Sequence, residues 1–332
     1  MDEAKVNSNQ SPEWRAPGVS VVLPILDEER FLAGAISAIL AQRYEGLLEV
    51  ILALGPSKDR TNEIAANLAA QDPRVVLVEN PSGRTAVALN LAIAASKYPV
   101  ICRIDGHAEI SPTYIHCAVE VLGQTQAVNV GGIMAAMGIG VFERAVASAM
   151  RSPLGVGAAK FHTGGKAGPT DTVYLGVFDK AALLAAGGYD ERFTRAQDWE
   201  LNYRLRQAGG IIWFDPELVV TYRPRPNLKA LSKQYFEYGR WRRAVGRNHK
   251  GTINLRYLAP PVAVALTALS LILGATLNAV FFLPASIYLL GNIVGSFFIG
   301  KNLIEKIELP IILATMHFSW GIGFLTSPRD LI

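Results

Sequence analysis

The chain has 332 residues, of which 50% are hydrophobic and 18% charged, a length that allows one large domain with an appendage. Its formal net charge of +4 is too small to indicate a nucleic-acid-binding protein, which usually presents a clustered basic face, so we expect no nucleic-acid partner. Two cysteines, Cys102 and Cys117, are too few for a disulfide framework and predict reduced core residues.

The chain begins with a polar segment. Residues 1–17 contain two prolines and no apolar stretch, so we do not expect a signal peptide there. A short polar terminus of this kind predicts a flexible N-terminal tail.

From residue 19 onwards, short apolar runs alternate with segments of helical periodicity. The apolar runs predict strands over 19–24, 48–54, 75–78 and 100–104, and the spacing between them predicts helices over 30–42, 61–70 and 86–95. This alternation is typical of an α/β domain with a mostly parallel sheet. Such sheets bind ligands beyond the carboxyl ends of their strands. We therefore expect four loops to converge on one crevice: Ile25–Glu29, Gly55–Asp59, Pro81–Arg84 and Asp105–Glu109.

The second part of the predicted domain is less regular. Residues 128–180 are rich in Gly and predict irregular structure, whereas 211–214 predicts a strand and 228–245 an amphipathic helix. We expect one α/β domain over 18–256, with an interfacial helix near 228–247.

An apolar region follows that domain. Residues 257–300 contain no Asp, Glu, Lys or Arg, and a spanning helix needs about 20 residues, so this region predicts two spans with a tight turn near 278–284. Residues 309–326 predict a third, shorter span, which makes 257–332 a membrane domain. Basic residues precede the first span: Arg240, Arg242, Arg243, Arg247, Lys250 and Arg256.

This basic cluster predicts the orientation of the chain. Positive charge that flanks a span normally stays in the cytoplasm, and Lys301 and Lys306, between the second and third predicted spans, agree with this rule. We expect a multi-pass protein of the cytoplasmic membrane with its first 256 residues in the cytoplasm and, after three spans, an extracytoplasmic C-terminus. The alternative is that the basic cluster is only a solvated helix face.

Asp105-Gly106-His107 directly follows a predicted strand. A carboxylate and an imidazole two residues apart can bind one divalent cation, which would hold a diphosphate leaving group. Imidazole favours manganese-like transition metals over magnesium. The alternative is an ordinary turn, which Asp-Gly often forms at the end of a strand.

Asp198 lies in Gln197–Glu200, shortly after the segment Gly187–Phe193. A carboxylate in this place could act as a general base that deprotonates an acceptor hydroxyl. The alternative is that Asp198 begins the following helix, where a carboxylate is favourable at the N-terminus.

Arg240 and Trp241 lie in a segment rich in aromatic and basic residues, Gln234–Arg243. Such a segment is typical of an interfacial helix, with aromatic rings at the level of the lipid headgroups and Arg on lipid phosphates. The alternative places Arg240 on a donor diphosphate and Trp241 near the acceptor.

Together these segments resemble the family 2 glycosyltransferases of the GT-A fold, over nearly the whole chain from residue 19. Val21–Glu29 resembles that family's opening strand and P-x-x-N-E-E turn, and Asp105-Gly106-His107 falls where the family has its metal-binding D-x-D. Gly187–Arg204 is similar to the acceptor segment that ends in E-D-x-E-L-x-x-R, and Arg240-Trp241 to the end of Q-x-x-R-W. A succinoglycan-synthesising subgroup is similar at further segments: 103–108, 171–176, 238–241 and 317–321.

The resemblance implies a membrane-anchored, inverting glycosyltransferase with a GT-A domain, which is Rossmann-like with a mostly parallel sheet. The implied donor is a nucleotide-diphosphate hexose, with UDP and glucose favoured, and the implied cofactor is a divalent metal, with Mn²⁺ favoured and Mg²⁺ possible. Asp198 would be the catalytic base, and Asp105 and His107 the metal ligands. The donor-binding residues would be Pro24, Leu26, Glu28, Asp59, Arg84, Asp105 and Arg240. The acceptor-binding residues would be Trp199, Glu200 and Trp241.

Three positions depart from the pattern of the family. Ala53 and Leu54 stand where the family has the acidic pair of D-D-G-S, so the acidic residue that would hold the base of the donor is absent. His107 replaces the second Asp of D-x-D. Glu237 replaces the Gln of Q-x-x-R-W, which implies different acceptor contacts.

The membrane segments imply a lipid-linked saccharide as acceptor, in exopolysaccharide or cell-envelope glycan synthesis. One alternative is a synthase that loads a sugar onto polyprenyl phosphate. Another is a catalytically inactive membrane scaffold of the same fold. A nucleotide hydrolase is disfavoured because the sequence has no P-loop.

Overall fold

The computed structural model describes residues 16–332, so most of the predicted tail over 1–17 lies outside the described residues. The first part of the domain alternates strands and helices in the predicted order. Its elements are β1 (Val19–Ile25), α1 (Leu32–Leu40), β2 (Leu48–Leu54), α2 (Thr61–Gln71), β3 (Val75–Glu79), α3 (Thr85–Ala95) and β4 (Val100–Arg103). The predicted and observed ends of these elements agree to within two residues.

The second part of the domain is more regular than predicted. Its elements are β5 (Glu109–Ile110), α4 (Tyr114–Thr125), β6 (Asn129–Ala136), α5 (Val141–Met150), α6 (Pro153–Val156), α7 (Lys160–Thr163), β7 (Gly168–Pro169), β8 (Tyr174–Asp179), α8 (Lys180–Ala185), α9 (Gln197–Gln207) and β9 (Ile212–Tyr222). The prediction of irregular structure over 128–180 is wrong for β6, α5 and β8. Gly131 and Gly132 lie inside β6, at a bulge against β9, and a Cβ on Gly132 would overlap the carbonyl oxygen of Leu218. Glycine therefore serves close backbone approach in this strand.

The strands form one mixed sheet in the order β3-β2-β1-β4-β8-β6-β9-β5, and β7 pairs with β9. Strands β1 to β4 are parallel, β8 is antiparallel to both of its neighbours, and β6 and β9 are again parallel. The carboxyl ends of the parallel strands consequently meet at one edge of the sheet, where the predicted crevice lies.

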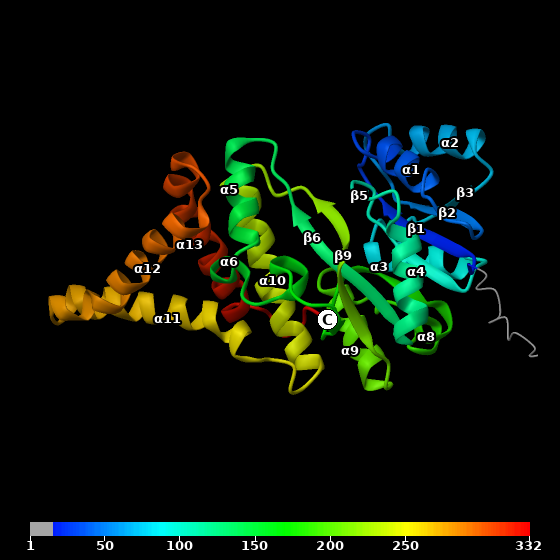
Figure 1. Cartoon of the computed structure of the whole chain (residues 1–332). Coiled ribbons are helices and arrows are strands. Elements are labelled where there is room, and N and C mark those ends of the chain that lie inside the picture. The colour runs from blue at the N-terminus through cyan, green and yellow to red at the C-terminus, as the bar shows by residue number, and fades with distance from the viewer. Residues whose placement is uncertain (1–15) are drawn as a thin grey trace, which may run out of the picture.

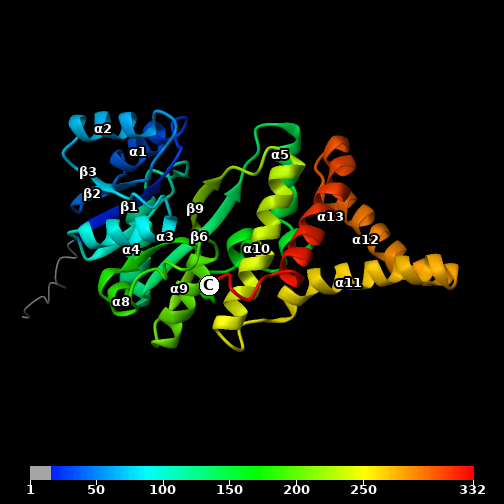
Figure 2. The same ribbon diagram turned by 180° about the vertical axis from the view of Figure 1, so that it is seen from behind.

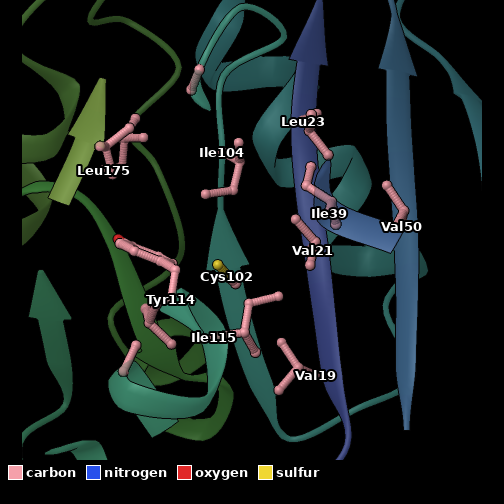
Figure 3. Packing of buried hydrophobic residues seen from close by; sticks show 14 of the residues in the cluster. Val19, Val21, Leu23, Ile39, Val50, Cys102, Ile104, Tyr114, Ile115 and Leu175 are labelled. Carbon is pink, nitrogen blue, oxygen red and sulfur yellow. The ribbon is translucent and has the colours of Figure 1, made fainter. Parts of the chain in front are cut away.

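Apolar side chains cover both faces of the sheet. On one face, alternate residues of β1 pack under α1 and α4 with Cys102 of β4, as Figure 3 shows for Val19, Val21 and Leu23. The other face packs against α3 and α9. Cys102 is buried and Cys117 partly buried, and both are free thiols, as predicted.

Five helical segments follow the sheet: α10 (Leu228–Asn248), α11 (Leu255–Thr276), a 3₁₀ turn η1 (Ala279–Phe282), α12 (Leu283–Ile299) and α13 (Leu303–Leu325). Helices α11, α12 with its preceding turn, and α13 are long and apolar enough to cross a membrane. Figures 1 and 2 show α11 pointing away from the sheet and α12 returning towards it, whereas α13 lies beside α10.

The last helix begins six residues before the predicted third span, so Lys306 lies inside it rather than in a loop. The sequence did not predict this start, because the first residues of the helix include charged ones that are unusual in a membrane span. Asn302 caps the helix by accepting a hydrogen bond from the backbone N–H of Glu305, 3.0 Å away, and the Glu305 carboxylate is buried against Ser148 of α5.

Candidate active site

The loops after β1, β2, β3 and β4 come together as predicted. The backbone N–H of Glu28 donates to Thr61 Oγ1 at 2.7 Å, and that of Lys58 donates to Asp27 Oδ1 at 2.7 Å, which joins the first two loops. The side chain of Leu26 lies against Gly55 and Gly83, which belong to the second and third loops. The fourth loop joins through His107, whose Nδ1 lies 2.7 Å from Glu28 Oε1.

Arg103 connects the two carboxylates expected to carry the chemistry. Its side chain is 7% exposed, and its Nη2 lies 3.2 Å from Asp105 Oδ1 while its Nη1 donates to Asp198 Oδ1. Burial lowers the pKa of the Arg103 guanidinium, but the two carboxylates outweigh burial and hold that pKa above its ordinary value. Arg103 is therefore a permanent cation between Asp105 and Asp198.

Asp198 is the second residue of α9 and lies in its first turn. Its carboxylate interacts with Arg103 instead of capping the helix, and the residue at the N-cap is Ala196, whose left-handed φ of 60° is unfavourable for a side chain. Burial raises the pKa of Asp198 to about 6, although Arg103 opposes the shift. A carboxylate with this pKa is mostly ionised at neutral pH and is a stronger base than an ordinary Asp.

The other predicted donor-binding residues line the loops in different ways. Pro24 and Leu26 lie at the end of β1, where the side chain of Leu26 is 40% exposed. The carboxylate of Asp59 accepts hydrogen bonds from the backbone N–H groups of Thr61, at 3.0 Å, and Glu29, at 3.2 Å, so it holds the loop. Arg84 Nη1 donates to the carbonyl oxygen of Glu191 at 3.1 Å, which ties the third loop to the segment before Asp198.

Arg240 lies on α10. Its Nη1 is 3.1 Å from Glu237 Oε1, and its guanidinium lies 5.6 Å from the ring centre of Phe236. Both of these partners belong to α10 itself, one turn before Arg240, and neither lies in the donor-side loops. Its assignment to the donor therefore stays a prediction.

Two of the three predicted acceptor-binding side chains are buried. Glu200 is 1% exposed and binds Arg204 Nε at 2.8 Å and His249 Nε2 at 2.9 Å. Trp241 is 4% exposed and packs against Phe193, with ring centres 6.0 Å apart. These placements do not favour direct contact with an acceptor, because the carboxylate of Glu200 already has protein partners and the ring of Trp241 is already packed. Both side chains instead fix the segment that carries Asp198.

Trp199 is partly exposed and takes part in a stack that joins α9 to α11. The guanidinium carbon of Arg242 lies 3.7 Å from the ring centre of Trp199 and 3.8 Å from that of Tyr257. Burial lowers the pKa of Arg242 to about 10, and the group remains charged at neutral pH. Such sandwiches are favourable because an aromatic face attracts a cation.

Sequence reasoning gave no role to Arg103, Arg242 or His249. A signal was present for Arg103, since it is the last residue of β4 and precedes Asp105 by two, so both lie at the same edge of the sheet. Arg242 was counted only within a basic cluster. The contact between His249 and Glu200 joins residues 49 positions apart, and no local pattern predicts it.

Two possible cation ligands lie at the predicted metal position. No group of three or more His, Cys, Asp or Glu side chains is arranged around one point within the described part of the chain. Asp105 and His107 nevertheless offer a carboxylate and an imidazole. The carboxylate of Glu28 at His107 Nδ1 favours the tautomer whose Nε2 lone pair is free, the usual arrangement for a metal-ligating His.

The sheet and its crevice are those of the GT-A glycosyltransferases, the class to which this fold belongs. A family model described as Glycosyl transferase family 2 matches residues 20–183. The chain is 32% identical over 321 residues to the succinoglycan biosynthesis protein ExoA of Rhizobium meliloti (strain 1021), covering 95% of this chain and 96% of the relative. The chain belongs to glycosyl transferase family 2, and it is an enzyme of the glycosyltransferase class.

Two more distant proteins are similar over nearly their whole length. One is the dolichyl N-acetyl-alpha-D-glucosaminyl phosphate 3-beta-D-2,3-diacetamido-2,3-dideoxy-beta-D-glucuronosyltransferase of Methanococcus voltae, 22% identical, with 92% of this chain and 95% of the relative covered. The other is a solved structure, the mannosyltransferase PcManGT from Pyrobaculum calidifontis in complex with GDP-Man and Mn²⁺. It superposes with a TM-score of 0.65 at 18% identity and covers 97% of this chain and 91% of its own. This likeness supports the fold.

Proposed function

We propose that this chain is a membrane-anchored, inverting glycosyltransferase that moves a hexose from a nucleotide-diphosphate sugar to a lipid-linked saccharide, with the catalytic domain in the cytoplasm. The bridge that Arg103 forms between Asp105 and Asp198 carries the proposal. Two partly buried carboxylates, which we assign as the base and as a group on the diphosphate side, meet through it at the carboxyl ends of the strands. An inverting transfer needs these two functions on opposite sides of the anomeric carbon.

In the proposed reaction, the carboxylate of Asp198 accepts the proton of the acceptor hydroxyl. The acceptor oxygen forms a bond to the anomeric carbon while the bond to the diphosphate oxygen breaks, and the nucleoside diphosphate leaves with that electron pair. Arg84 and Arg240 would stabilise the negative charge of the leaving group. Glu28 and Asp59, with Pro24 and Leu26, would line the nucleoside side of the crevice.

We propose Asp105 and His107 as ligands of a divalent cation, Mn²⁺ in preference to Mg²⁺. Such a cation would supply charge stabilisation to the diphosphate. The contact between His107 Nδ1 and the carboxylate of Glu28 supports this assignment, because it orients the ring and leaves Nε2 free. The mannosyltransferase from Pyrobaculum calidifontis forms a complex with GDP-Man and Mn²⁺, which agrees with a nucleotide-sugar donor and a divalent metal. The donor favoured here remains a UDP-sugar, with glucose as the hexose.

The lipid-linked acceptor is supported by two observations. A hollow of about 510 Å³ lies between the catalytic domain and the base of α11, and Lys160 and Arg256 line it together with Asp171. Two cations at the foot of a membrane helix suit a phosphate at the level of the lipid headgroups. The relatives named for succinoglycan biosynthesis and for transfer to a dolichyl-linked sugar agree with this class of acceptor and with a role in exopolysaccharide or envelope glycan synthesis.

The test is a transfer assay with purified full-length protein in lipid nanodiscs, with Mn²⁺ and a panel of nucleotide sugars. The acceptor is either a preassembled lipid-linked saccharide or bare polyprenyl phosphate. We expect an anomerically inverted product on the saccharide and none with Asp198→Asn. Transfer only to polyprenyl phosphate would instead identify the synthase alternative. No transfer with any donor would favour the inactive scaffold, a possibility that the intact Asp105–Arg103–Asp198 arrangement argues against.

A further inference from the structure

Helix α13 differs from the other two apolar helices in what it touches. About a third of it is buried inside the protein, 33% against 11% for each of the other two. Its fully buried residues pack against α5, β6 and α10, all of which belong to the catalytic domain. These residues are Leu309, Ile312, Leu313 and Met316.

Helices α13 and α10 run side by side in the same direction. Ser319 Oγ lies 2.9 Å from Ser232 Oγ, and Arg243 Nη1 donates to the carbonyl oxygen of Leu325 at 2.7 Å, so residue numbers rise together along the pair. Between these contacts the two backbones touch. A Cβ on Gly323 would overlap the carbonyl oxygen of Phe236. The C-terminal half of α13 is therefore fixed to α10.

Helix α10 is too charged to lie in hydrocarbon. It carries an ionic side chain on nearly every turn: Lys229, Lys233, Glu237, Arg240, Arg243 and Arg247. Charged side chains within the hydrocarbon region of a membrane are rare and need partners or water. Since α10 must stay outside the hydrocarbon region, a helix in backbone contact with it cannot cross that region.

The segment after α13 returns to the catalytic domain. Arg247 Nη2 donates to the carbonyl oxygen of Ser327 at 2.8 Å, and Leu331 and Ile332 pack in the cluster formed by Phe193 and Trp241. Figures 1 and 2 both show the C-terminus beside α9 and α10, far from the turn between α11 and α12.

The free side of α13 carries an exposed apolar stripe. Its members lie on one side of the helix, with Ile304, Ile307 and Ile311 in the first half and Ile322 and Leu325 near the end. The stripe adjoins the two other apolar helices, since Tyr288 Oη of α12 lies 3.0 Å from His317 Nδ1 and Gly321 lies against Pro260 of α11. Because the stripe is continuous with the apolar surfaces of α11 and α12, we expect the bilayer to cover it.

We propose that α13 lies along the membrane surface with its stripe in the interface, and that only α11 and α12 cross the bilayer. The C-terminus then stays on the side of the catalytic domain, and the predicted third span is replaced by an in-plane helix that holds α10 at the surface. The proposal rests on the membrane attachment proposed above and not on the sugar-transfer chemistry, so a failed transfer assay leaves it standing.

The first test labels single cysteines in membrane vesicles of known orientation. The full-length chain with Cys102→Ala and Cys117→Ser receives Arg329→Cys after α13, with Gln124→Cys on α4 and Leu277→Cys after α11 as references for the two sides. All three sites are exposed. We expect a membrane-impermeant maleimide to label the first two from one side and Leu277→Cys from the other. Labelling of Arg329→Cys together with Leu277→Cys would overturn the proposal, and so would labelling of all three from one side.

The second test measures depth. An environment-sensitive fluorophore is placed at Ile304→Cys, Ile311→Cys or Ile322→Cys, the outer two of which are about 27 Å apart along the helix. Lipids with quenchers at defined depths should report the same shallow depth for all three. A deep central position with shallow ends would mean a span. No quenching at any position would mean that protein covers the stripe, and either result would refute the proposal.

Discussion

Replacing Arg103 by Gln should move the acidic limb of the pH–rate profile to higher pH. With a pKa of about 6, Asp198 limits kcat/KM below that pH, because only the ionised carboxylate accepts a proton. With this pKa, Asp198 is ionised in about nine in ten wild-type molecules at pH 7 and in about one in ten at pH 5.

The size of the shift follows from the position of Arg103. An opposite charge within hydrogen-bonding distance lowers the pKa of a carboxyl by about 1–3 units, and Arg103→Gln removes this effect from the partly buried carboxyl of Asp198. A shift of about 2 units would lower kcat/KM at pH 7 roughly tenfold and restore it near pH 9.

The assay is initial-rate transfer between pH 5 and 9, alongside thermal unfolding to exclude loss of fold. Arg74→Gln is the matched control, because it removes an Arg–carboxylate pair at the surface, 2.7 Å from Asp72 and remote from the site. Its profile should match that of the wild type. An Arg103→Gln enzyme that stays folded with the wild-type limb would refute the role of Asp198 as the titrating base.

Three further predictions concern single side chains. Asp198→Asn should lower turnover by about 10²–10⁴-fold while donor binding, measured by calorimetry, stays nearly unchanged; wild-type turnover would remove Asp198 as base. His107→Asp should keep activity and shift its preference from Mn²⁺ towards Mg²⁺, whereas His107→Ala should weaken metal binding in titrations of turnover; three superimposable curves would remove His107 from the site. Trp241→Ala should cost about 3–5 kcal/mol of unfolding free energy in thermal or denaturant unfolding, with little change in the KM for the acceptor. Trp199 is partly exposed, so Trp199→Ala should raise that KM. A raised KM for Trp241→Ala and an unchanged KM for Trp199→Ala would show that Trp241 contacts the acceptor.

The strands that build the crevice could be predicted from sequence because each is a short apolar run with turn residues at its end. Leu48–Leu54 is observed with the predicted bounds, and Asp105 follows its strand as expected. In these segments, local pattern and tertiary environment point to the same structure.

The parts that could not be predicted depend on contacts between distant segments. Arg103 and Asp198 are 95 residues apart, and the sequence around neither residue predicts that they pair. An aromatic and basic run such as Gln234–Arg243 suits a membrane interface and a protein core equally well. Only tertiary packing reveals that Trp241 is buried. Glycines that signal a loop in isolation, such as Gly131 and Gly132, serve close strand packing in β6.

The stacking of Arg242 between Trp199 and Tyr257 has a mechanical consequence. Trp199 follows Asp198 directly, and Tyr257 belongs to the first turn of α11, so one guanidinium joins the segment of the proposed base to the start of an apolar helix. Membrane helices change their tilt with the thickness of the bilayer. This stacking couples α11 to α9, so under the proposed membrane attachment a change in the tilt of α11 would be passed to the segment that carries Asp198.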